Sequence, residues 1–362
     1  MEGSPMSKSF SVSSKIRGTY DVYFIDSLRE HLTQLATQKN NIFLIDATVA
    51  QLFKNDIQQA VAGSRIVILH CNEENKTINY AQEIIRELIQ QDVRKNDVLI
   101  AIGGGIAQDI VTFISSILFR GVNWKFYPTT LLAQCDSCIG SKSSINFDQF
   151  KNLLGTFNPP SEIFINSTFL NTLSESEIRS GIGEMLHYFF SDGIDLAQEV
   201  SDNFNQLLTD RSVLPYYIEN SLRIKKAIIE IDEFDTSIRH IFNYGHTFGH
   251  AIEAITHYGI PHGQAISIGM DLANYISLSL NMITDAQFTQ MHSILVKNIP
   301  AFKFEGSIID QYLKALSKDK KNVGNKLGCI LTRGPGRLEK VFIDMDEKLK
   351  TLILNYTEAY GY

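Results

Sequence analysis

The chain of 362 residues is 44% hydrophobic and 20% charged, which is typical of a globular enzyme and long enough for two domains. Its formal net charge of -7 and its lack of a long basic run argue against a nucleic-acid partner. Four cysteines are too few for a disulfide framework, and no apolar run of about 18 residues is present, so we expect a cytoplasmic protein without a membrane span.

The opening residues, MEGSPMSKSF, lack the apolar core of a signal peptide. We interpret residues 1–10 as an expression tag and disordered start, with the native chain beginning at Met6.

The first half of the chain alternates short apolar runs with segments of helical spacing. The runs that we predict as strands are residues 41–49, 64–71, 97–105 and 123–134. Segments 77–93 and 106–119 have apolar residues at helical spacing. Continuous apolar strands that alternate with helices indicate a parallel sheet covered on both faces.

Helical patterns dominate after Pro159 and Pro160. One of them begins at Ser174, a predicted N-cap, with Glu177 three residues further on. The sequence therefore predicts an α/β domain of residues 11–160 and an α-helical domain of residues 161–362.

Three glycines, Gly103 to Gly105, lie between a predicted strand and a helix. Glycines there let a phosphate approach the backbone, and the helix N-terminus favours its negative charge. An ordinary tight turn would need the same residues, and the triplet alone favours that reading. Asp46 and the segment from Pro128 to Thr130 end two other strands, where a nucleotide commonly lies, and they strengthen the case for a cofactor.

A loop-like stretch rich in serine and glycine runs from Asp136 and contains Lys142, Lys151 and Asn152. Two ammonium groups and an amide can bind a phosphate or a carboxylate. The alternative is an ordinary solvated loop. Cys135 and Cys138 have CxxC spacing, but two reduced thiols explain them better than half a zinc site, because no second CxxC exists.

Four of the nine histidines are clustered, at positions 246, 250, 257 and 262. His246 and His250 are four residues apart and share one helix face, an arrangement that suits zinc. Glu184 lies among apolar residues, where an ionised carboxylate is costly unless it is paired or bound to a metal. Any one histidine could be a hydrogen-bonded core or surface residue, but the cluster favours a metal site. Spacing alone selects His246 and His250 as the ligand pair.

Together these motifs resemble 3-dehydroquinate synthase and its relatives, the sugar phosphate cyclases. The resemblance runs from Asp46 to Asp319 and rests on GGGIAQD, FRGVNWKFYPTTLLAQCDSCIGSK, KN, SGIGE and RHIFNYGHTFGHAIE followed by HG, in family order. It implies a Rossmann-like N-terminal domain and an α-helical C-terminal domain. It also implies a homodimeric enzyme that uses NAD and a divalent metal, zinc or else cobalt, on a phosphorylated sugar or keto acid.

The resemblance further implies roles for individual residues. The metal ligands would be Glu184, His246 and His262, which makes His250 a substrate contact and replaces the pair selected by spacing. NAD would contact Asp46, Glu73, Lys76, Gly104, Gly105, Asp109, Thr129 and Thr130. The substrate would contact Asp136, Lys142, Lys151, Asn152, Lys225, Arg239, Asn243, His250, Lys321 and Arg120, the last from across a dimer interface. Since Asp136 lies between Cys135 and Cys138, a redox role for that cysteine pair is discounted.

The chemistry of this family explains why such residues occur together. NAD oxidises a secondary alcohol to a ketone, and the metal lowers the pKa of the hydroxyl that is oxidised. The ketone acidifies the neighbouring C–H, so phosphate can be eliminated, and the hydride then returns from NADH. Ring opening and an intramolecular aldol step form a carbocycle. The protein orients one substrate and excludes water.

Three positions depart from the family pattern. His187 stands where a lysine is expected three residues after the metal glutamate, Ser141 replaces a glycine and Gln264 replaces a glutamate. A lysine is a long, charged donor to a substrate hydroxyl, whereas a histidine is shorter and can be neutral. Unchanged chemistry and a changed substrate or stereochemistry are equally open readings of His187.

Lys225 and Arg239 are assigned by the resemblance to a substrate carboxylate. They favour cyclisation of 3-deoxy-D-arabino-heptulosonate 7-phosphate to 3-dehydroquinate. The alternatives are cyclisation of sedoheptulose 7-phosphate, of the valiolone type, or of glucose 6-phosphate, of the 2-deoxy-scyllo-inosose type. A glycerol-type metal-dependent dehydrogenase is more remote, because a neutral polyol needs no group of charged residues. A catalytically silent relative is disfavoured, because every predicted ligand of metal and NAD is present.

Overall fold

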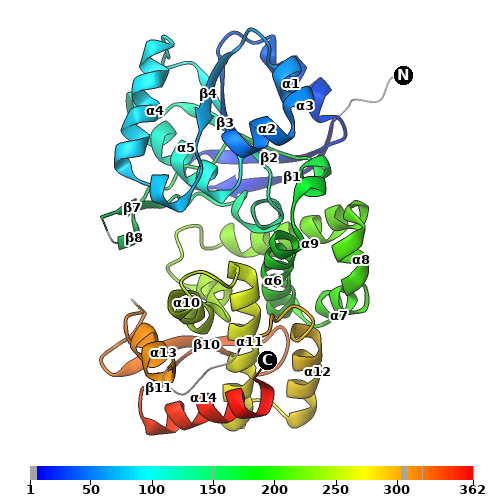
Figure 1. Ribbon diagram of the computed structural model, residues 1–362, viewed down its shortest axis with the longest axis vertical. Coiled ribbons are helices and arrows are strands. Elements are labelled where there is room, and N and C mark those ends of the chain that lie inside the picture. Colours follow the sequence, from blue (N-terminus) through cyan, green and yellow to red (C-terminus); the bar gives the residue numbers. More distant parts are fainter. Residues whose placement is uncertain (1–5, 149, 303–307, 320, 362) are drawn as a thin grey trace. The chain divides into compact units, whose positions relative to one another are not determined.

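The computed structural model describes residues 6–148, 150–302, 308–319 and 321–361 (Figure 1). It consists of two compact units. Unit 1 comprises Met1–Leu173 and Lys225–Phe234, and unit 2 comprises Ser174–Ile224 and Asp235–Tyr362. The boundary expected after residue 160 therefore lies after Leu173, and the first unit also includes a later segment that sequence patterns did not assign to it.

Unit 1 is built on a seven-stranded sheet in the order β1-β2-β9-β6-β5-β3-β4. The strands are β1 (Met6–Ser14), β2 (Gly18–Ile25), β3 (Asn41–Asp46), β4 (Arg65–Leu69), β5 (Val98–Gly103), β6 (Asn123–Pro128) and β9 (Glu162–Ile165). Only β1 and β2 pair antiparallel, and the other neighbours are parallel. Every residue of β3 is buried, as its unbroken apolar run predicts for a strand covered on both faces. The predicted parallel sheet is confirmed.

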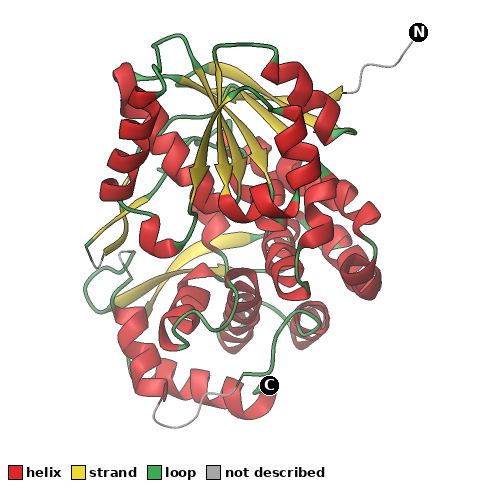
Figure 2. Cartoon of the chain, turned by 45° about the horizontal axis from the view of Figure 1, so that its top comes forward, coloured by secondary structure: helices red, strands yellow, loops and turns green. Residues whose placement is uncertain are grey.

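Helices of unit 1 flank the sheet on both sides (Figure 2). They are α1 (Leu28–Ala36), α2 (Ala47–Leu52), α3 (Lys54–Ala60), α4 (Ile78–Gln90) and α5 (Gly105–Ile117). A separate hairpin, β7 (Ile145–Phe147) with β8 (Phe150–Leu154), follows the sheet strand β6 in the chain. The predicted strand 123–134 ends at Pro128, and the chain is helical from Leu131, with a π-helical turn from Ala133 to Ser137.

Residues 6–10 form the start of β1 and are not part of a disordered leader, which corrects the expectation from the sequence. Met6 pairs with Ile25 on β2, and the register continues to Ser14 opposite Gly18. Phe10 and Val12 are buried at alternate positions, so the segment has the pattern of a half-buried strand. The first five residues of the proposed tag lie outside the described residues.

The segment Lys225–Phe234 is bound to the first strand of unit 1 by carboxylates. Ser14 Oγ donates to Glu233 Oε1 at 2.8 Å, and the backbone amide of Lys15 donates to Glu233 Oε2 at 2.7 Å. Glu230 Oε1 accepts from the amide of Ser13 at 2.7 Å. These contacts explain why a segment distant in sequence belongs to this unit.

His31 on α1 is a buried titratable group in the core of unit 1. It is 4% exposed, and its Nδ1 lies 2.6 Å from the hydroxyl of Tyr127. Burial, followed by the charge of Lys125, lowers the pKa of His31 from 6.5 to about 4. Between these values the unfolded chain binds a proton that the folded chain does not, so stability falls as the pH drops through this window.

We expect His31→Gln to remove most of this pH dependence. Between about pH 7.5 and about pH 5, the free energy of unfolding of the unmodified protein should fall by about 2 kcal/mol more than that of the variant. Urea unfolding at the two pH values measures the difference. Parallel losses in the two proteins would show that another group controls the acid sensitivity.

Unit 2 is mainly helical, as predicted. Its helices are α6 (Glu175–Asp192), α7 (Asp195–Asp202), α8 (Phe204–Thr209), α10 (His246–Ile255), α11 (His262–Ser279), α12 (Asp285–Leu295), α13 (Ile308–Ser317) and α14 (Glu347–Tyr360), and α9 (Leu214–Ile229) ends in unit 1. The N-cap at Ser174 and its reciprocal bond with Glu177 are confirmed. The hairpin of β10 (Lys326–Thr332) and β11 (Leu338–Asp344) was not predicted. None of the described helices is long and apolar enough to cross a membrane.

Candidate active site

A carboxylate and three imidazoles meet inside unit 2. Glu184 comes from α6, while His246 and His262 are the first residues of α10 and α11. Glu184 Oε1 lies 2.8 Å from His262 Nε2 and 3.4 Å from His246 Nε2. One nitrogen from each of His246, His250 and His262 lies within 4.8 Å of the others. In the described part of the chain, these three histidines form a group that could hold a metal ion.

Two glycines allow α6 and α11 to approach closely enough to bring Glu184 beside His262. A Cβ on Gly183 would lie 1.9 Å from the carbonyl oxygen of Gly263, and a Cβ on Gly263 would lie 1.8 Å from that of Ser180. The amide of Gly263 donates to Ser180 Oγ at 3.1 Å. Each glycine is next in sequence to one of the two site residues, so the motifs SGIGE and HG encode the helix crossing as well as the ligands.

The start of α10 is fixed on α11 in a similar way. Gly245, the N-cap of α10, has a φ of 79°, which favours glycine. A Cβ there would also lie 2.5 Å from Met270 Cγ. In turn, a Cβ on Gly269 would lie 2.1 Å from the carbonyl oxygen of Gly245. This close packing places His246, the residue after Gly245, at the carboxylate.

Hydrogen bonds to the other ring nitrogen orient both histidines. His246 Nδ1 lies 3.1 Å from the carbonyl oxygen of Tyr244, and His262 Nδ1 lies 3.1 Å from Glu253 Oε1. Because a carbonyl and a carboxylate only accept, each Nδ1 carries a proton and each Nε2 is directed to Glu184. Metal-binding histidines commonly donate such a hydrogen bond from the ring nitrogen that does not bind the metal. Sequence reasoning missed Glu253, although a buried acid in the apolar run HAIEAI was a visible signal.

The charges of the cluster are strongly coupled. Burial by itself raises the pKa of Glu184, but His246, His187 and His262 together hold that pKa well below its usual value. Burial acts to lower the pKa of His262, but hydrogen bonds to Glu184 and Glu253 raise it to about 10. A cation bound to His262 would take the place of the proton on its Nε2, so cation binding would release a proton. One carboxylate and two imidazoles fit a catalytic zinc-type centre with an open position.

His187 lies one turn after Glu184 on α6 and is 1% exposed. Its Nδ1 is 3.5 Å from Glu184 Oε2, and its ring lies 4.7 Å from Tyr188, 5.7 Å from Phe242 and 5.0 Å from His246 between ring centroids. The residue that departs from the family pattern therefore contacts the expected metal ligands. Of the other two departures, the side chain of Gln264 donates to the carbonyl of Asn298, whereas the buried hydroxyl of Ser141 has no hydrogen-bond partner among the described residues.

The expected cofactor residues of unit 1 lie at the carboxyl ends of neighbouring parallel strands. Ile45 pairs with Ile102, and Gly103 pairs with Pro128, so β3, β5 and β6 end at the same level. The chain passes from β3 to its neighbour β4 and then crosses to β5 on the other side of β3, which makes this edge a topological switch point where α/β proteins bind ligands.

The glycine triplet shapes this edge. A Cβ on Gly103 would lie 2.5 Å from Ala107 Cβ, so this glycine permits the close packing of α5 on the sheet. Gly104 is the N-cap of α5, and a Cβ on Gly105 would meet nothing within 4 Å. The open backbone at Gly105 is therefore accessible to an anion at a helix N-terminus.

The other expected cofactor residues at the strand ends make local hydrogen bonds. Asp46 Oδ1 accepts from the amide of Val49 at 3.0 Å. The amide of Thr129 donates to the carbonyl of Gly103 at 3.0 Å, and Thr130 Oγ1 accepts from the amide of Ala133 at 3.1 Å.

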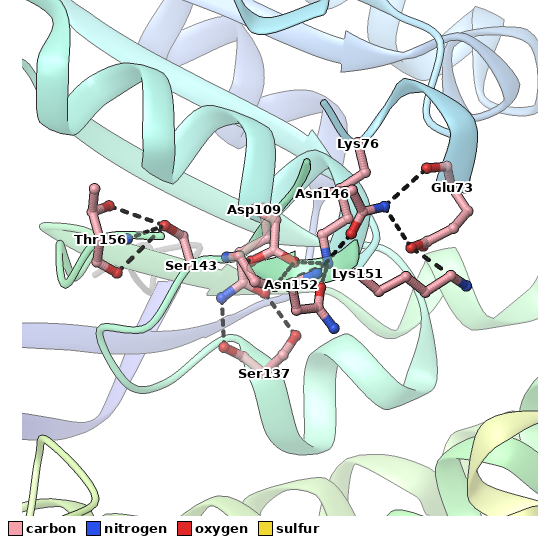
Figure 3. A network of polar contacts seen from close by, with 11 residues as sticks. Glu73, Lys76, Asp109, Ser137, Ser143, Asn146, Lys151, Asn152 and Thr156 are labelled. Carbon is pink, nitrogen blue, oxygen red and sulfur yellow. Dashed lines mark hydrogen bonds and ion pairs between the residues drawn. The ribbon is translucent and has the colours of Figure 1, made fainter. Parts of the chain in front are cut away.

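The hairpin β7–β8 brings expected cofactor and substrate residues together (Figure 3). Lys76 Nζ lies 2.5 Å from Asp109 Oδ2 and donates to Asn152 Oδ1 at 2.9 Å. Lys151 Nζ lies 3.6 Å from Glu73 Oε1. Burial raises the pKa of Asp109, and Lys76 opposes the shift.

The remaining expected residues are divided between the two units. In unit 1, Lys225 Nζ donates to Asp136 Oδ1 and to its carbonyl oxygen, both at 2.7 Å, while Lys142 and Arg120 are exposed. In unit 2, Asn243 and Lys321 line a cavity of about 250 Å³, and Lys321 and His250 line another of about 810 Å³. Arg239 lies in the same 3-10 turn as Asn243.

Two adjoining segments of the chain match known families. Residues 66–180 match the 3-dehydroquinate synthase N-terminal family, and residues 181–322 match the C-terminal family. The 3-dehydroquinate synthase of Thermoanaerobacter sp. (strain X514) is 31% identical over 344 residues, which are 92% of this chain and 97% of that protein. That of Alkaliphilus metalliredigens (strain QYMF) is 33% identical over 343 residues, which are 93% of this chain and 96% of that protein.

Solved structures with the same fold include two cyclases. A 2-deoxy-scyllo-inosose synthase complexed with carbaglucose-6-phosphate, NAD+ and Co2+ has a TM-score of 0.85 at 22% identity, covering 96% of this chain and 99% of that chain. The 2-epi-5-epi-valiolone synthase of Streptomyces hygroscopicus subsp. jinggangensis 5008, with NAD+ and Zn2+ bound, has a TM-score of 0.83 at 23% identity, covering 97% and 100%. A probable glycerol dehydrogenase from Sinorhizobium meliloti 1021 has a lower TM-score of 0.60 at 13% identity, covering 93% and 96%.

Proposed function

Because the chain belongs to the 3-dehydroquinate synthase family, we propose that it converts 3-deoxy-D-arabino-heptulosonate 7-phosphate into 3-dehydroquinate. The chain is an NAD-dependent, metal-using sugar phosphate cyclase. The relatives above 30% identity are named 3-dehydroquinate synthase, and their similarity to this chain extends over most of their length. The observation that most directly supports the chemistry is the buried Glu184 carboxylate facing Nε2 of His246 and His262.

The residues of both units fit the two groups that the reaction requires. A divalent metal held by Glu184, His246 and His262 would supply a positive charge that lowers the pKa of the substrate hydroxyl. NAD held along the ends of β3, β5 and β6 would accept a hydride and return it. The relatives of known structure contain NAD+ with Co2+ or Zn2+, which supports this assignment.

The protein's own groups would bind and orient the sugar phosphate. We assign substrate contacts to the side chains of Lys142, Lys151, Asn152, Asn243 and Lys321, with His250 near the phosphate and Arg120 from a second protomer. Lys225 and Arg239 would hold the carboxylate end, and the ion pair of Lys225 with Asp136 orders that ammonium group before substrate arrives. Holding the substrate in one orientation lowers the entropy that must be lost to reach the transition state, and this would contribute much of the rate enhancement.

Phosphate release from a panel of substrates tests the proposal. The purified protein, with NAD and zinc, is incubated separately with 3-deoxy-D-arabino-heptulosonate 7-phosphate, sedoheptulose 7-phosphate and glucose 6-phosphate. We expect phosphate release from the first, with 3-dehydroquinate as product and no net NADH. Release from only a carboxylate-free sugar would overturn the substrate assignment, and steady NADH formation with a simple polyol would indicate a dehydrogenase.

A changed substrate remains a second candidate function because of His187. A lysine is expected there, and the histidine lies against Glu184 instead of presenting a long charged arm. We expect His187→Lys to shift the ratio of phosphate-release rates among the three candidate substrates more than it changes the unfolding midpoint. The same substrate panel measures the ratio, with His292→Lys as a control histidine on α12. An unchanged profile would support the reading of a family variant with unchanged chemistry.

We also propose a homodimer in which Arg120 contributes to the partner's site. If so, Arg120→Ala and Glu184→Gln are each inactive alone but complement each other when protomers exchange. One of the two sites in each mixed dimer would then be complete, so the mixture should recover about a quarter of the full activity. Subunit exchange followed by the phosphate-release assay measures this recovery. No recovery in a mixture with proven exchange would place Arg120 in its own protomer's site.

The cytoplasmic location stays a prediction.

A further inference from the structure

We propose that Asn146 is a positioning residue that joins the cofactor group Glu73 to the substrate group Asn152. Neither the sequence motifs nor the family resemblance gives Asn146 a role. The inference rests on the proposed function for the roles of its two partners. It assigns to one side chain the task of holding both subsites of unit 1 in the same arrangement.

Asn146 is the middle residue of β7 and is 7% exposed. Its Nδ2 donates to Glu73 Oε1 at 2.9 Å and to the Glu73 carbonyl oxygen at 3.3 Å. Its Oδ1 accepts from the backbone amide of Asn152 at 2.8 Å. The donor end of the carboxamide is therefore directed to the cofactor group and the acceptor end to the substrate group (Figure 3).

The backbone of Asn152 adds a second observation. Its φ is 53°, in the left-handed region that is uncommon for non-glycine residues, although asparagine adopts it more readily than most, and neighbouring hydrogen bonds help to hold it. Asn146 provides that support through the bond to the Asn152 amide, and Asn152 Oδ1 then accepts from Lys76 Nζ. The amide of Asn146 also donates to the Lys76 carbonyl at 2.7 Å, so the lysine and the hairpin are held in register.

Truncation of Asn146 would release both partners at once. Among the described residues, the Glu73 carboxylate would lose its amide donor and keep the more distant contact with Lys151, since the Nζ to Oε1 distance is 3.6 Å. Asn152 would lose the bond that stabilises its left-handed backbone. The metal site would not change, because Glu184 and the histidines belong to unit 2.

The test measures cofactor and substrate binding separately in Asn146→Ala. We expect the Kd of NAD for zinc-loaded protein, measured by calorimetry without sugar phosphate, to rise about tenfold, because a hydrogen bond to a charged group is lost. The KM of the sugar phosphate that the unmodified protein turns over should also rise about tenfold, with unchanged zinc content. Asn158→Ala is the matched control, since Asn158 is a half-buried asparagine of unit 1 that donates to Ser115 Oγ. Asn146→Ser, whose side chain is too short to reach both partners, should reproduce the paired loss if the alanine variant does not fold.

Double-mutant cycles distinguish positioning from general destabilisation. With Asn146→Ala already present, Glu73→Ala should add little further loss of NAD affinity, and Asn152→Ala should add little further increase in KM. Additive effects in both cycles, or unchanged NAD affinity in a folded Asn146 variant, would overturn the proposal. If the unmodified protein turns over none of the candidate sugar phosphates, the proposed function fails, while the NAD cycle still decides the role of Asn146.

Discussion

Replacing Glu184 by glutamine is expected to remove the bound metal and nearly all turnover. The carboxylate is buried and faces Nε2 of both His246 and His262, so a neutral amide would leave a cation without its only anionic ligand in this set. We expect metal affinity to fall by at least about 100-fold and turnover by about a thousandfold. Metal content measured after purification, together with phosphate release at saturating zinc, checks both expectations. His262→Ala should give the same paired loss.

Two comparisons make this experiment decisive. Glu175→Gln is the control, because Glu175 lies on the same helix but is exposed, and its ion pair with Arg179 contributes little. Glu253→Gln should give an intermediate loss of metal, about 10-fold, because it weakens the orientation of His262 without removing a ligand. If metal content is unchanged in both Glu184→Gln and His262→Ala, the ligand set is wrong.

Gly183→Ala is expected to destabilise unit 2 strongly, although alanine is the better helix former. An exposed glycine in a helix interior usually gains about 0.5–1 kcal/mol on replacement by alanine. Here the new Cβ would lie 1.9 Å from the Gly263 carbonyl oxygen, which is backbone and cannot move without displacing α11. We expect a loss of about 3 kcal/mol in the free energy of unfolding, with reduced metal binding because Glu184 and His262 are forced apart.

Urea unfolding and metal content are the measurements for this variant. Gly193→Ala is a matched control, since Gly193 ends the same helix, has a φ of 173° that any residue can adopt, and has open space around its Cα. The control should be nearly neutral. If Gly183→Ala is also neutral, the two helices do not cross as closely as described, and the account of how Glu184 meets His262 would have to be abandoned.

The sequence predicted the parts of the fold that depend on local pattern. Strand β3 was predictable because a short unbroken apolar run is typical of a strand with both faces covered. The start of α6 was predictable because Ser174 and Glu177 satisfy each other's hydrogen bonds. Strand β1 was missed because its side chains alternate with serines and resemble a polar leader. The hairpin β10–β11 was missed because its second strand is only half buried and so lacks an apolar run.

The site was only partly predictable, for a different reason. Spacing gave His246 and His250 as partners because it reports on one helix face, whereas Glu184 is opposed by the first residues of two different helices. Which residues of separate helices meet is decided by the glycines at the crossings. The resemblance supplied the set of Glu184, His246 and His262, but not Glu253, whose role depends on the direction of one imidazole nitrogen.

The assignment of Lys225–Phe234 to unit 1 has a consequence for how the chain is made. A nascent polypeptide that has emerged only as far as Leu173 lacks Lys225, which pairs with Asp136, and Glu233, which holds the turn after β1. Unit 1 therefore cannot be completed on the ribosome until about sixty further residues, including the first helices of unit 2, have been translated. A gene fragment that ends at Leu173 would encode an incomplete unit 1, so the two units would have to fold together.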